Sequence, residues 1–344
     1  MRVAAVLVTH NRPQLLLQAL AALRAQTRPL DAIVVVDNGS DPPCMPDRPG
    51  GIGAAGGHQE VKLLRSNVNL GGAGGFALGM THAFAAGYDW IWLLDDDAMA
   101  RPDALAQLLD ALDALEGLGA GIGALCGTVR EFGDIALRHR RRYHLPTGIE
   151  LPLPRSAYEG PPCRVDTASF VGFLVAASAI AEVGMPERGF FLSYDDTEYA
   201  LRLRRAGRTL WLVPGSVVEH LRERRARLRA GPFGPKHYFT IRNRLAVARA
   251  YATLPVVPTV VAALFGLALW VASGGRLRRG AVSILLRAIG DGVKGRLGPF
   301  PETLARRPAQ PAGPPQASAG TGPLGDAAGT GPPQGSTGTG PGRA

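Results

Sequence analysis

Three consecutive carboxylates follow a short apolar run in the stretch Trp90-Ile91-Trp92-Leu93-Leu94-Asp95-Asp96-Asp97. A short apolar run between polar segments is typical of a strand that is buried on both faces. In open α/β sheets, ligands bind in the crevice beyond the carboxyl ends of the strands. The stretch therefore predicts a buried strand over 90–94 that leads into an acidic ligand site.

The acidic triplet, Asp95 to Asp97, has two interpretations. Three adjacent carboxylates repel one another and raise one another's pKa, and a divalent cation removes that conflict. Oxygen ligands suit Mg²⁺ or Mn²⁺, and such ions commonly also hold substrate phosphates. The alternative is a solvated acidic turn, because most charge clusters are surface features.

Strand-like and helix-like segments alternate over residues 1–130. This alternation predicts an α/β fold with a mostly parallel, Rossmann-like sheet flanked by helices. The expected strands are 2–8, 32–36, 61–64, 90–94, 170–176, 190–193 and 209–213. One helix is expected to begin at Pro13, and three more are expected over 73–86, 102–115 and 195–206. Residues 134–164 are expected to be irregular and basic.

The cysteines Cys44, Cys126 and Cys163 form no CxxC pair. They argue against a disulfide framework and a zinc site, and they fit a reducing compartment. The apolar run at residues 3–8 is too short for the hydrophobic region of a signal peptide.

The net charge of +10 is unevenly distributed. Residues 1–220 carry 20 Lys and Arg against 24 Asp and Glu, whereas residues 221–307 carry 17 against 3. A basic segment on a mildly acidic body indicates an anionic partner surface. We expect that surface to be a membrane and not nucleic acid, because the basic segment contains the most apolar stretch of the chain.

That stretch, residues 254–273, carries no charge, and at about 20 residues it is long enough to span a bilayer. Arg276, Arg278 and Arg279 follow it, and residues 281–289 are amphipathic. Membrane contact is favoured over a buried hairpin, and both spanning and lying in the interface remain open. Residues 308–344 are rich in Pro, Gly and Thr and are expected to be disordered.

Polar residues also follow the first two strands. Thr9 and Asn11 precede a helix whose N-terminus suits an anionic or nucleotide ligand. Asp37 follows the second strand, where its carboxylate can accept hydrogen bonds from a base or a ribose. Alternatively, Asp37 satisfies the turn that it opens.

A glycine-rich segment runs from Asn67 to Phe76, before an expected helix. Glycines such as Gly71 and Gly72 let the backbone approach a phosphate or a sugar closely, although a flexible loop is the simpler explanation. The segment lacks the Gly-Lys-Ser/Thr of a phosphate-binding loop. It follows the third strand and not the first, which disfavours a nicotinamide-dependent dehydrogenase.

Two further features carry chemistry. Asp195, Asp196 and Glu198 open a helix, where the dipole favours acids, but two adjacent carboxylates exceed that need and one of them could act as a general base. His220 could complete a metal site with the acidic triplet, although a lone histidine is usually structural.

The order of these motifs over about residues 2–250 resembles the inverting glycosyltransferases of family 2, which have the GT-A fold. The resemblance includes the Gly172-Phe173 stretch. It implies that Asp37 contacts the nucleotide base and that Asp196 is the catalytic base. It further implies the following roles: Asp95 and Asp97 hold the metal and the diphosphate, Asp96 lies near the sugar or ribose, and His220 is a metal ligand as in some members.

A finer resemblance is to actinobacterial cell-wall galactofuranosyltransferases and rhamnosyltransferases. It is carried by residues 69–76, 90–97 and 287–292. Asp195-Asp196 stands where the family commonly has Glu-Asp, which leaves the base in place. The motifs leave the choice between galactofuranose and rhamnose open.

Together these features predict a metal-dependent, inverting glycosyltransferase that uses Mg²⁺ or Mn²⁺. Its donor would be a UDP- or dTDP-linked sugar, and its acceptor a polyprenyl-diphosphate-linked glycan of the cell envelope. The alternative is a non-catalytic, membrane-associated adaptor or nucleotide-sugar-binding protein. Arg242 is a further candidate for phosphate binding.

The basic segment would hold the enzyme at the anionic inner leaflet, on the cytoplasmic face of the cell membrane. The expected organisation is a GT-A domain over 1–250, a membrane-associating helical segment over 251–305 and a disordered tail over 306–344.

Overall fold

The apolar run at 90–94 forms β4 (Trp90–Asp95), a strand inside a mixed sheet. β4 pairs in parallel with β1 (Val3–Thr9) and antiparallel with β12 (Phe173–Ala176). The side chains from Trp90 to Leu94 are buried, as expected for a strand that is covered on both faces. The predicted buried strand is therefore confirmed, and Asp95 lies at its carboxyl end beside Val8 of β1.

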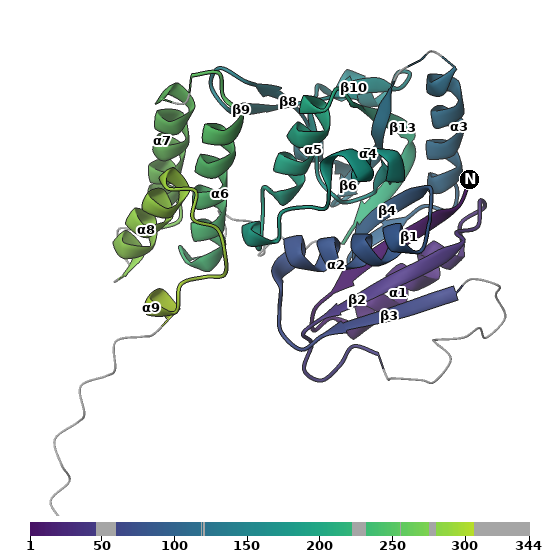
Figure 1. Cartoon of the computed structure of the whole chain (residues 1–344), viewed down its shortest axis with the longest axis horizontal. Coiled ribbons are helices and arrows are strands. Elements are labelled where there is room, and N and C mark those ends of the chain that lie inside the picture. Colours follow the sequence, from purple (N-terminus) through teal and green to yellow (C-terminus); the bar gives the residue numbers. More distant parts are fainter. Residues whose placement is uncertain are drawn as a thin grey trace, which may run out of the picture. The chain divides into compact units, whose positions relative to one another are not determined.

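The N-terminal part of the chain supplies the parallel strands. β2 (Ala32–Asn38) pairs with β1, and β3 (Glu60–Ser66) pairs with β2, both in parallel. α1 (Pro13–Arg24) connects β1 to β2, and α2 (Gly71–Ala85) connects β3 to β4 (Figure 1). The alternation inferred from the sequence is confirmed here.

The other half of the sheet mixes directions. β6 (Ile122–Glu131) pairs antiparallel with β12 and in parallel with β13 (Thr209–His220). The predicted end of the last strand before Pro214 is wrong, because β13 continues to His220. Pro214 falls at a register shift of β13, where the regular ladder is already interrupted and a missing N–H is tolerated. The sheet order is β10-β13-β6-β12-β4-β1-β2-β3, where β10 is Cys163–Val165. In addition, β5 (Ala98–Ala100) pairs with β13 and β7 (Asp134–Ile135) pairs with β6.

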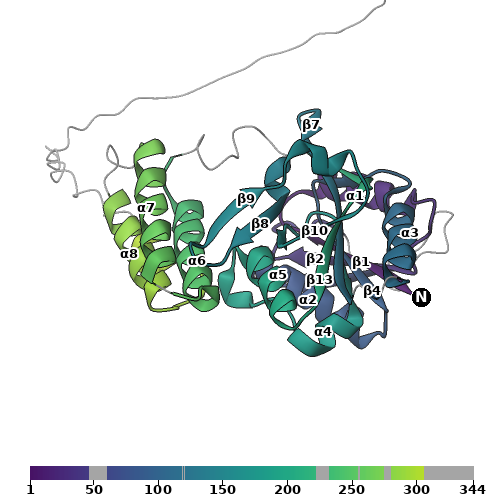
Figure 2. The ribbon, with the colours of Figure 1, turned by 90° about the horizontal axis from the view of Figure 1, so that it is seen from above.

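Short elements complete the sheet and cover it (Figure 2). They are the strands β5 (Ala98–Ala100), β7 (Asp134–Ile135) and β10 (Cys163–Val165), the 3₁₀ turns η1 (Leu137–His139), η2 (Arg155–Tyr158) and η3 (Arg188–Phe190), and the helices α3 (Ala104–Glu116), α4 (Ala177–Val183) and α5 (Asp195–Arg205).

Residues 134–164 are more ordered than the sequence indicated. They include β8 (Arg140–His144) and β9 (Ile149–Pro152), which form a second small sheet with β11 (Thr167–Ala168). Arg140 is fully buried and donates to the backbone carbonyls of Gly127 and Val171. The segment is basic as expected, and this guanidinium is held inside the protein by carbonyl acceptors.

The predicted strand over 190–193 is wrong. The segment contains the end of η3, and then Phe191, Ser193 and Tyr194 have positive φ values of 62°, 67° and 67°. Residues that carry a Cβ rarely adopt a positive φ, so the backbone of this segment is strained. Its carbonyl groups bind side chains of a distant helix and are not available to a neighbouring strand.

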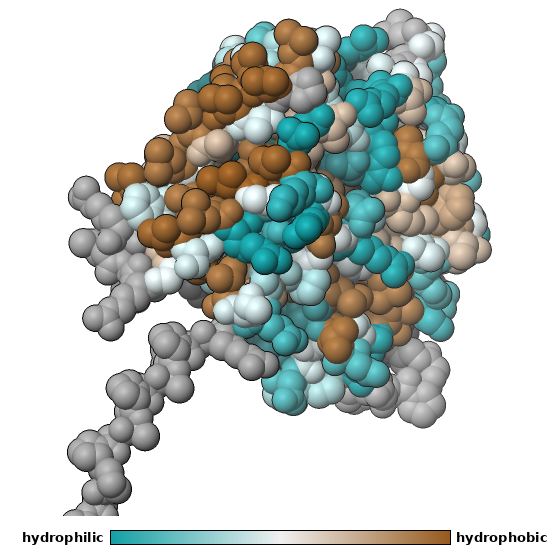
Figure 3. Space-filling model, turned by 60° about the vertical axis from the view of Figure 1, so that its left-hand side comes forward, coloured by the Kyte–Doolittle hydropathy of each residue, from teal (hydrophilic) through white to brown (hydrophobic). Residues whose placement is uncertain are grey.

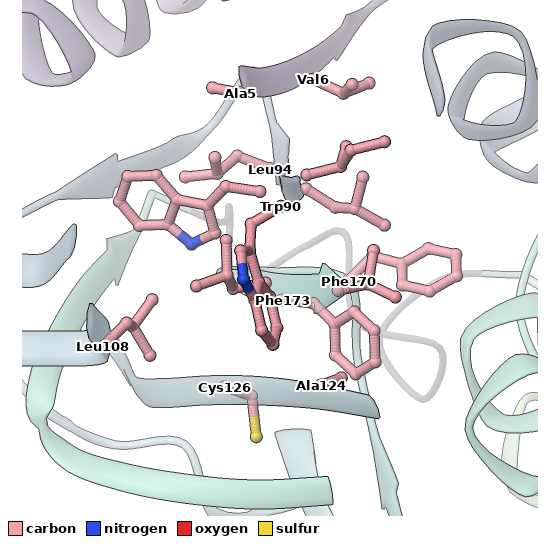
Figure 4. Packing of buried hydrophobic residues seen from close by; sticks show 14 of the residues in the cluster. Ala5, Val6, Trp90, Leu94, Leu108, Ala124, Cys126, Phe170 and Phe173 are labelled. Atoms are coloured by element: carbon pink, nitrogen blue, oxygen red, sulfur yellow. The ribbon is translucent and has the colours of Figure 1, made fainter. Parts of the chain in front are cut away.

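The main core lies on both faces of the sheet. Figure 4 shows side chains of β4 (Trp90, Leu94), β12 (Phe173) and β6 (Cys126) within one buried cluster. The ring of Phe170 meets that of Phe173 edge to face, with centroids 5.6 Å apart. This core anchors the strands whose ends carry the acidic residues.

Three C-terminal helices form a second core. α6 (Pro235–Tyr251) packs against α7 (Val256–Ala272) and α8 (Ala281–Val293), and it also contacts α5. Figures 1 and 2 both show α6, α7 and α8 side by side. The predicted boundary at residue 250 falls at the end of α6, and the domain division stays a prediction.

The structure is a computed structural model. It describes residues 1–45, 60–117, 119, 121–221, 232–254, 256–274 and 280–305, the last of which include α9 (Glu302–Ala305). The expected disordered tail lies outside these residues, as do residues 46–59 of the Pro- and Gly-rich stretch 41–59, where the sequence predicts a flexible loop. Across the described ranges, no helix combines the length and apolar character that crossing a bilayer requires, and α7 has 17 residues.

Candidate metal and nucleotide-sugar site

The acidic triplet meets His220 because two strands pair. β5 follows the triplet and runs antiparallel to β13, which sets Ala98 opposite His220. The backbone N–H of Leu221 also donates to the carbonyl of Asp97 at 2.7 Å. As a result, Nε2 of His220 lies 3.1 Å from Oδ1 of Asp97.

Asp95, Asp97 and His220 offer ligand atoms that lie within 4.8 Å of one another. Burial, followed by repulsion from Asp97, raises the pKa of Asp95 to about 7. Burial acts in the same direction on Asp97, but the hydrogen bond and charge of His220 outweigh it and lower the pKa of Asp97. A divalent cation fits this set of carboxylate and imidazole donors.

His220 is held from its other side by Glu131, a residue that sequence analysis missed. Nδ1 of His220 lies 2.9 Å from Oε1 of Glu131, and Nε2 of His139 lies 3.1 Å from the same oxygen. Burial lowers the pKa of His139 to about 4 despite Glu131. One sequence signal could have indicated Glu131. It follows a mostly apolar stretch, as Asp95 does, and so stands at the end of a strand.

Asp96 is tied to the first strand. Its carboxylate accepts a hydrogen bond from Oγ1 of Thr9 at 2.8 Å and from a guanidinium nitrogen of Arg12 at 3.1 Å. The same nitrogen of Arg12 donates to Asp97 at 3.0 Å. Burial raises the pKa of Asp96 in spite of these partners. Thr9 and Arg12 therefore lie beside the acidic triplet, and nucleotide binding by Thr9 stays a prediction.

Asp37 and Asn11 hold a loop in the described structure. Asp37 is fully buried and accepts from the backbone N–H groups of Ser40 and Cys44, at 3.3 and 3.0 Å. Asn11 has a φ of 56°, and its side-chain oxygen accepts from the N–H of Asp41. These contacts agree with the turn-forming alternative for Asp37, and its contact with a nucleotide base stays a prediction.

The glycines of the glycine-rich segment have different environments. Gly71 has a φ of +71°, and a Cβ there would lie 2.0 Å from the carbonyl oxygen of Phe191. A Cβ on Gly75 would lie 2.6 Å from Val8, so this glycine lets α2 approach β1. Gly72 faces open space and is the member best placed for a ligand, while Asn67 is exposed.

Asp195 and Asp196 begin α5. Oδ1 of Asp196 accepts from the N–H and hydroxyl of Thr197 at 2.6 and 3.2 Å, and Oδ2 lies 3.9 Å from a nitrogen of Arg141. Burial raises the pKa of Asp196 although Arg141 opposes the shift. Burial and Asp196 raise the pKa of Asp195 well above its usual range, and Asp95 contributes too. The second acid pair therefore lies near the acidic triplet.

Arg141 and Glu150 support that acid pair and were not singled out from the sequence. Oε1 of Glu150 lies 3.3 Å from Nε of Arg141 and accepts from the Thr197 hydroxyl at 3.1 Å. Glu198, by contrast, pairs with Arg202 at 2.7 Å on the same helix. The acid that serves structure is therefore Glu198.

The expectation that Arg242 binds phosphate is wrong. Its guanidinium is buried and donates to the carbonyls of Gly189, Phe190 and Gly298. The side-chain amide of Asn243 donates to three carbonyls of residues 190–193, at 2.7 to 2.9 Å. Both residues hold the strained loop that precedes the second acid pair.

The segment 287–292 joins α8 to α6. Asp291 accepts from the hydroxyl of Tyr238 at 2.9 Å and from Nε of Arg287 at 2.6 Å. A Cβ on Gly292 would lie 2.6 Å from the carbonyl oxygen of Arg242. This motif therefore packs α8 against the residues that hold the strained loop.

Comparison with known proteins shows which family model and which proteins this chain resembles. Residues 4–153 match the family model of Glycosyl transferase family 2. The chain is similar to galactofuranosyltransferase GlfT1 of Mycobacterium tuberculosis, with 37% identity over 213 residues, 60% of this chain and 65% of that protein. For GlfT1 of Mycolicibacterium smegmatis the identity is 34% over 60% of this chain and 66% of that protein. The match thus spans slightly less than two thirds of these relatives.

Solved structures support the fold. The S. aureus TarS fragment 1–349 in complex with UDP-GlcNAc superposes with a TM-score of 0.54 at 13% identity, over 88% of this chain and 83% of that one. GalNAc-T7 with UDP, GalNAc and Mn²⁺ gives a TM-score of 0.51 at 15% identity, over 75% of this chain and 53% of that one. The fold is GT-A-like, and the match to the glycosyl transferase family 2 model covers residues 4–153.

Proposed function

We propose that this protein is a glycosyltransferase that moves a sugar from a nucleotide-diphosphate donor to a hydroxyl group of an acceptor. The observation that carries the proposal is the convergence of two groups of acids. Asp95 and Asp97 with His220 form one group, and Asp195 and Asp196 form the other. A cation-binding group for a diphosphate beside a group that accepts a proton is what such a transfer requires.

Each acid group has a distinct role in the proposed reaction. A divalent cation, when bound to Asp95, Asp97 and His220, would stabilise the negative charge of the leaving diphosphate. Asp196 accepts the proton of the attacking hydroxyl at Oδ2, since its Oδ1 is already engaged by Thr197. The hydroxyl attacks the anomeric carbon opposite the leaving group, so the configuration is inverted in one displacement.

We propose galactofuranose as the sugar, because the relatives with 34–37% identity are galactofuranosyltransferases. The test is donor turnover by the purified chain with UDP-galactofuranose, dTDP-rhamnose and UDP-hexoses, each with Mn²⁺, with Mg²⁺ and with a chelator. We expect turnover of UDP-galactofuranose only with a divalent cation.

Other outcomes of this test are informative. Turnover of dTDP-rhamnose alone would reassign the sugar, and turnover in chelator would remove the metal from the proposal. A folded chain that binds a donor without turning it over, even with a lipid-linked acceptor, would favour the non-catalytic adaptor.

We further propose that the acceptor is a polyprenyl-diphosphate-linked glycan at a membrane surface. The outward face of α7 is apolar, and its exposed side chains recur every three or four residues (Figure 3). The residues with this spacing are Val256, Val260, Leu264, Leu267 and Val271, and Val257 is also exposed beside them. The opposite face of α7 is buried in the second core. This outward face suits an interfacial helix that lies in the plane of the membrane.

Charge favours a lipid surface over a second copy of this chain. The segment 221–307 carries 17 Lys and Arg against 3 Asp and Glu, so two copies meeting there would repel each other. An anionic leaflet instead attracts such a segment, by about 1 kcal/mol for each Lys or Arg near the surface. We therefore propose attachment to the cytoplasmic face of the cell membrane.

Flotation with lipid vesicles tests the attachment. We expect the protein to float with vesicles of phosphatidylcholine and phosphatidylglycerol, less with phosphatidylcholine alone, and less again at high salt. The Leu264→Ser variant should lose flotation, whereas Leu17→Ser, at a similarly exposed leucine of α1, should not. Equal flotation of both variants, or a dimer without lipid binding, would refute attachment through α7.

A further inference from the structure

A buried chain of polar side chains reaches His220 from the side opposite the acidic triplet. Oε1 of Glu131 lies 2.9 Å from Nδ1 of His220 and 3.1 Å from Nε2 of His139. Nδ1 of His139 lies 2.6 Å from the hydroxyl of Ser169, to which Arg140 also donates at 3.2 Å. The side chains of Glu131, His139 and His220 are only 9–13% exposed.

The direction of each hydrogen bond in this series of side chains follows from the groups at its two ends, the Arg140 guanidinium and the Glu131 carboxylate. An ionised carboxylate only accepts hydrogen bonds, so both ring nitrogens that face Glu131 carry a proton. Because Arg140 donates to the Ser169 oxygen, the hydroxyl proton of Ser169 is free to donate to Nδ1 of His139. The protons therefore point from Arg140 through Ser169 and His139 to Glu131, and from Nδ1 of His220 to Glu131.

The strand pairing places the last member of this hydrogen-bonded series, His220, beside the acidic triplet. Glu131 is the last residue of β6 and His220 the last residue of β13, and these strands pair in parallel with Arg130 opposite Glu219. The rings of His139 and His220 also meet edge to face, with centroids 5.4 Å apart. With Nδ1 committed to Glu131, the Nε2 atom of His220 is directed at Asp97.

We propose that Glu131 is a positioning residue that sets the tautomer and orientation of His220, so that Nε2 faces a divalent cation held by Asp95 and Asp97. His139 and Ser169 hold Glu131 in place. Partners of this kind on a metal-bound histidine fix the ring and raise its basicity. The inference rests on the proposed function, because it assigns a role relative to the proposed cation.

A second cation among Glu131, His139 and His220 is the competing interpretation, since their ligand atoms also lie within 4.8 Å of one another. Such a cation would need a lone pair on Nδ1 of His220 and on Nε2 of His139. The hydrogen-bond directions give both atoms a proton instead. We therefore expect one Mn²⁺ per chain and not two.

The test is a titration of the full chain with Mn²⁺ in the absence of donor and acceptor. Binding is measured by electron paramagnetic resonance, which detects free Mn²⁺, and by calorimetry. Glu131→Gln removes the charge, and Glu131→Asp keeps the charge but withdraws the carboxylate by one methylene. Both should weaken Mn²⁺ binding about 10- to 100-fold, the range for partners of metal-bound histidines. Unchanged thermal unfolding of the metal-free variants would establish that they are folded.

Glu219→Gln is the matched control. Glu219 precedes His220 on the same strand, but its carboxylate pairs with Arg101 at 2.7 Å. We expect wild-type Mn²⁺ affinity from this variant. Wild-type affinity of Glu131→Asp would mean that only the charge of Glu131 matters and would overturn the positioning role. Two Mn²⁺ ions per wild-type chain would overturn it in favour of a second site.

The inference and the proposed function fail in different ways. If the wild-type chain binds no divalent cation, the metal dependence of the proposed function fails and the positioning role fails with it. If the wild-type chain binds one Mn²⁺ and both Glu131 variants bind it equally well, only the positioning role fails.

Discussion

Nε2 of His220 lies 3.1 Å from Oδ1 of Asp97, and this contact joins the end of β13 to the turn that follows β4. The contact exists because β5, which directly follows Asp97, runs antiparallel to the end of β13. The edge of the sheet therefore brings together ligand atoms that are far apart in the chain.

Replacement of His220 should weaken metal binding. We expect His220→Ala to raise the Kd for Mn²⁺ at least about tenfold, because a nitrogen ligand is lost while both carboxylates remain. Calorimetric titration of the purified variant measures this. His144→Ala, at an exposed histidine whose ring is hydrogen-bonded to Thr147, is the control and should bind as wild type. Equal affinities for all three proteins would exclude His220 from the site.

Metal binding should strengthen as the pH rises. Burial acts to lower the pKa of His220, but hydrogen bonds with Asp97 and Glu131 raise it to about 9. Burial and Asp97 raise the pKa of Asp95 to about 7. Below pH about 7, a cation must displace a proton from Asp95 and one from His220. Between pH about 7 and 9 it must displace only the proton of His220, and above pH about 9 it displaces neither.

The measurement is calorimetry in buffers of different ionisation enthalpy, which counts the protons released on Mn²⁺ binding. The logarithm of the association constant should rise by about two per pH unit below pH 7 and by about one between pH 7 and 9. An affinity that is constant over this range would contradict the raised pKa values of Asp95 and His220.

Loss of the proposed base should stop transfer but not metal binding. We expect Asp196→Asn to lower kcat about 10²- to 10⁴-fold, the usual contribution of a general base, with an unchanged Kd for Mn²⁺. Steady-state transfer assays measure the rate. Glu198→Gln on the same helix should retain kcat, since Glu198 pairs with Arg202. Full activity of Asp196→Asn would move the base to another residue.

The amide of Asn243 should matter for stability and for rate. In Asn243→Ala, carbonyls of the strained loop lose their donor, which costs about 1–3 kcal/mol for each buried group left unsatisfied. We expect a lower Tm and, at temperatures where the variant is folded, a lower kcat because Asp196 follows this loop. Thr240→Ala, which loses only a bond to Lys236 within α6, should keep its kcat. A normal kcat in Asn243→Ala would separate the loop from the chemistry.

Two glycines of α8 should respond oppositely to alanine. Gly290 faces open space, so Gly290→Ala should stabilise the protein by up to about 1 kcal/mol through helix propensity. In Gly292→Ala the new Cβ would lie 2.6 Å from the carbonyl oxygen of Arg242, so we expect a loss of about 1–3 kcal/mol. Chemical denaturation of both variants measures the difference. Equal stabilities would mean that α8 does not pack closely on α6.

Local patterns predicted much of the fold. The apolar runs at 2–8, 32–36 and 90–94 form β1, β2 and β4. A short run of consecutive apolar residues favours a strand that is covered on both faces, and this preference depends on local sequence alone. The strand expected at 190–193 is absent, since Arg242 and Asn243 bind its carbonyls and force a turn. A local pattern carries no information about such distant donors.

Asp95 to Asp97 and the pair Asp195 and Asp196 could also be singled out from the sequence, because consecutive acids at the end of an expected strand or the start of an expected helix are visible there. Glu131 and Arg12 were not, since each is an ordinary charged residue until a distant group faces it. Arg242 shows the reverse error. Its charge suggested a phosphate ligand, but the fold surrounds the guanidinium with backbone carbonyls.

By itself, the sequence determined the order of strands and helices in the first part of the chain and the acids Asp95 to Asp97 that follow β4. Apolar periodicity and turn residues act over a few positions, so they can be read without a structure. Only the tertiary structure decided that His220 meets Asp97, that Glu131 directs His220, and that α6 holds the loop before Asp196. These relationships depend on strand pairing and helix packing between segments distant in sequence, and no local pattern specifies them.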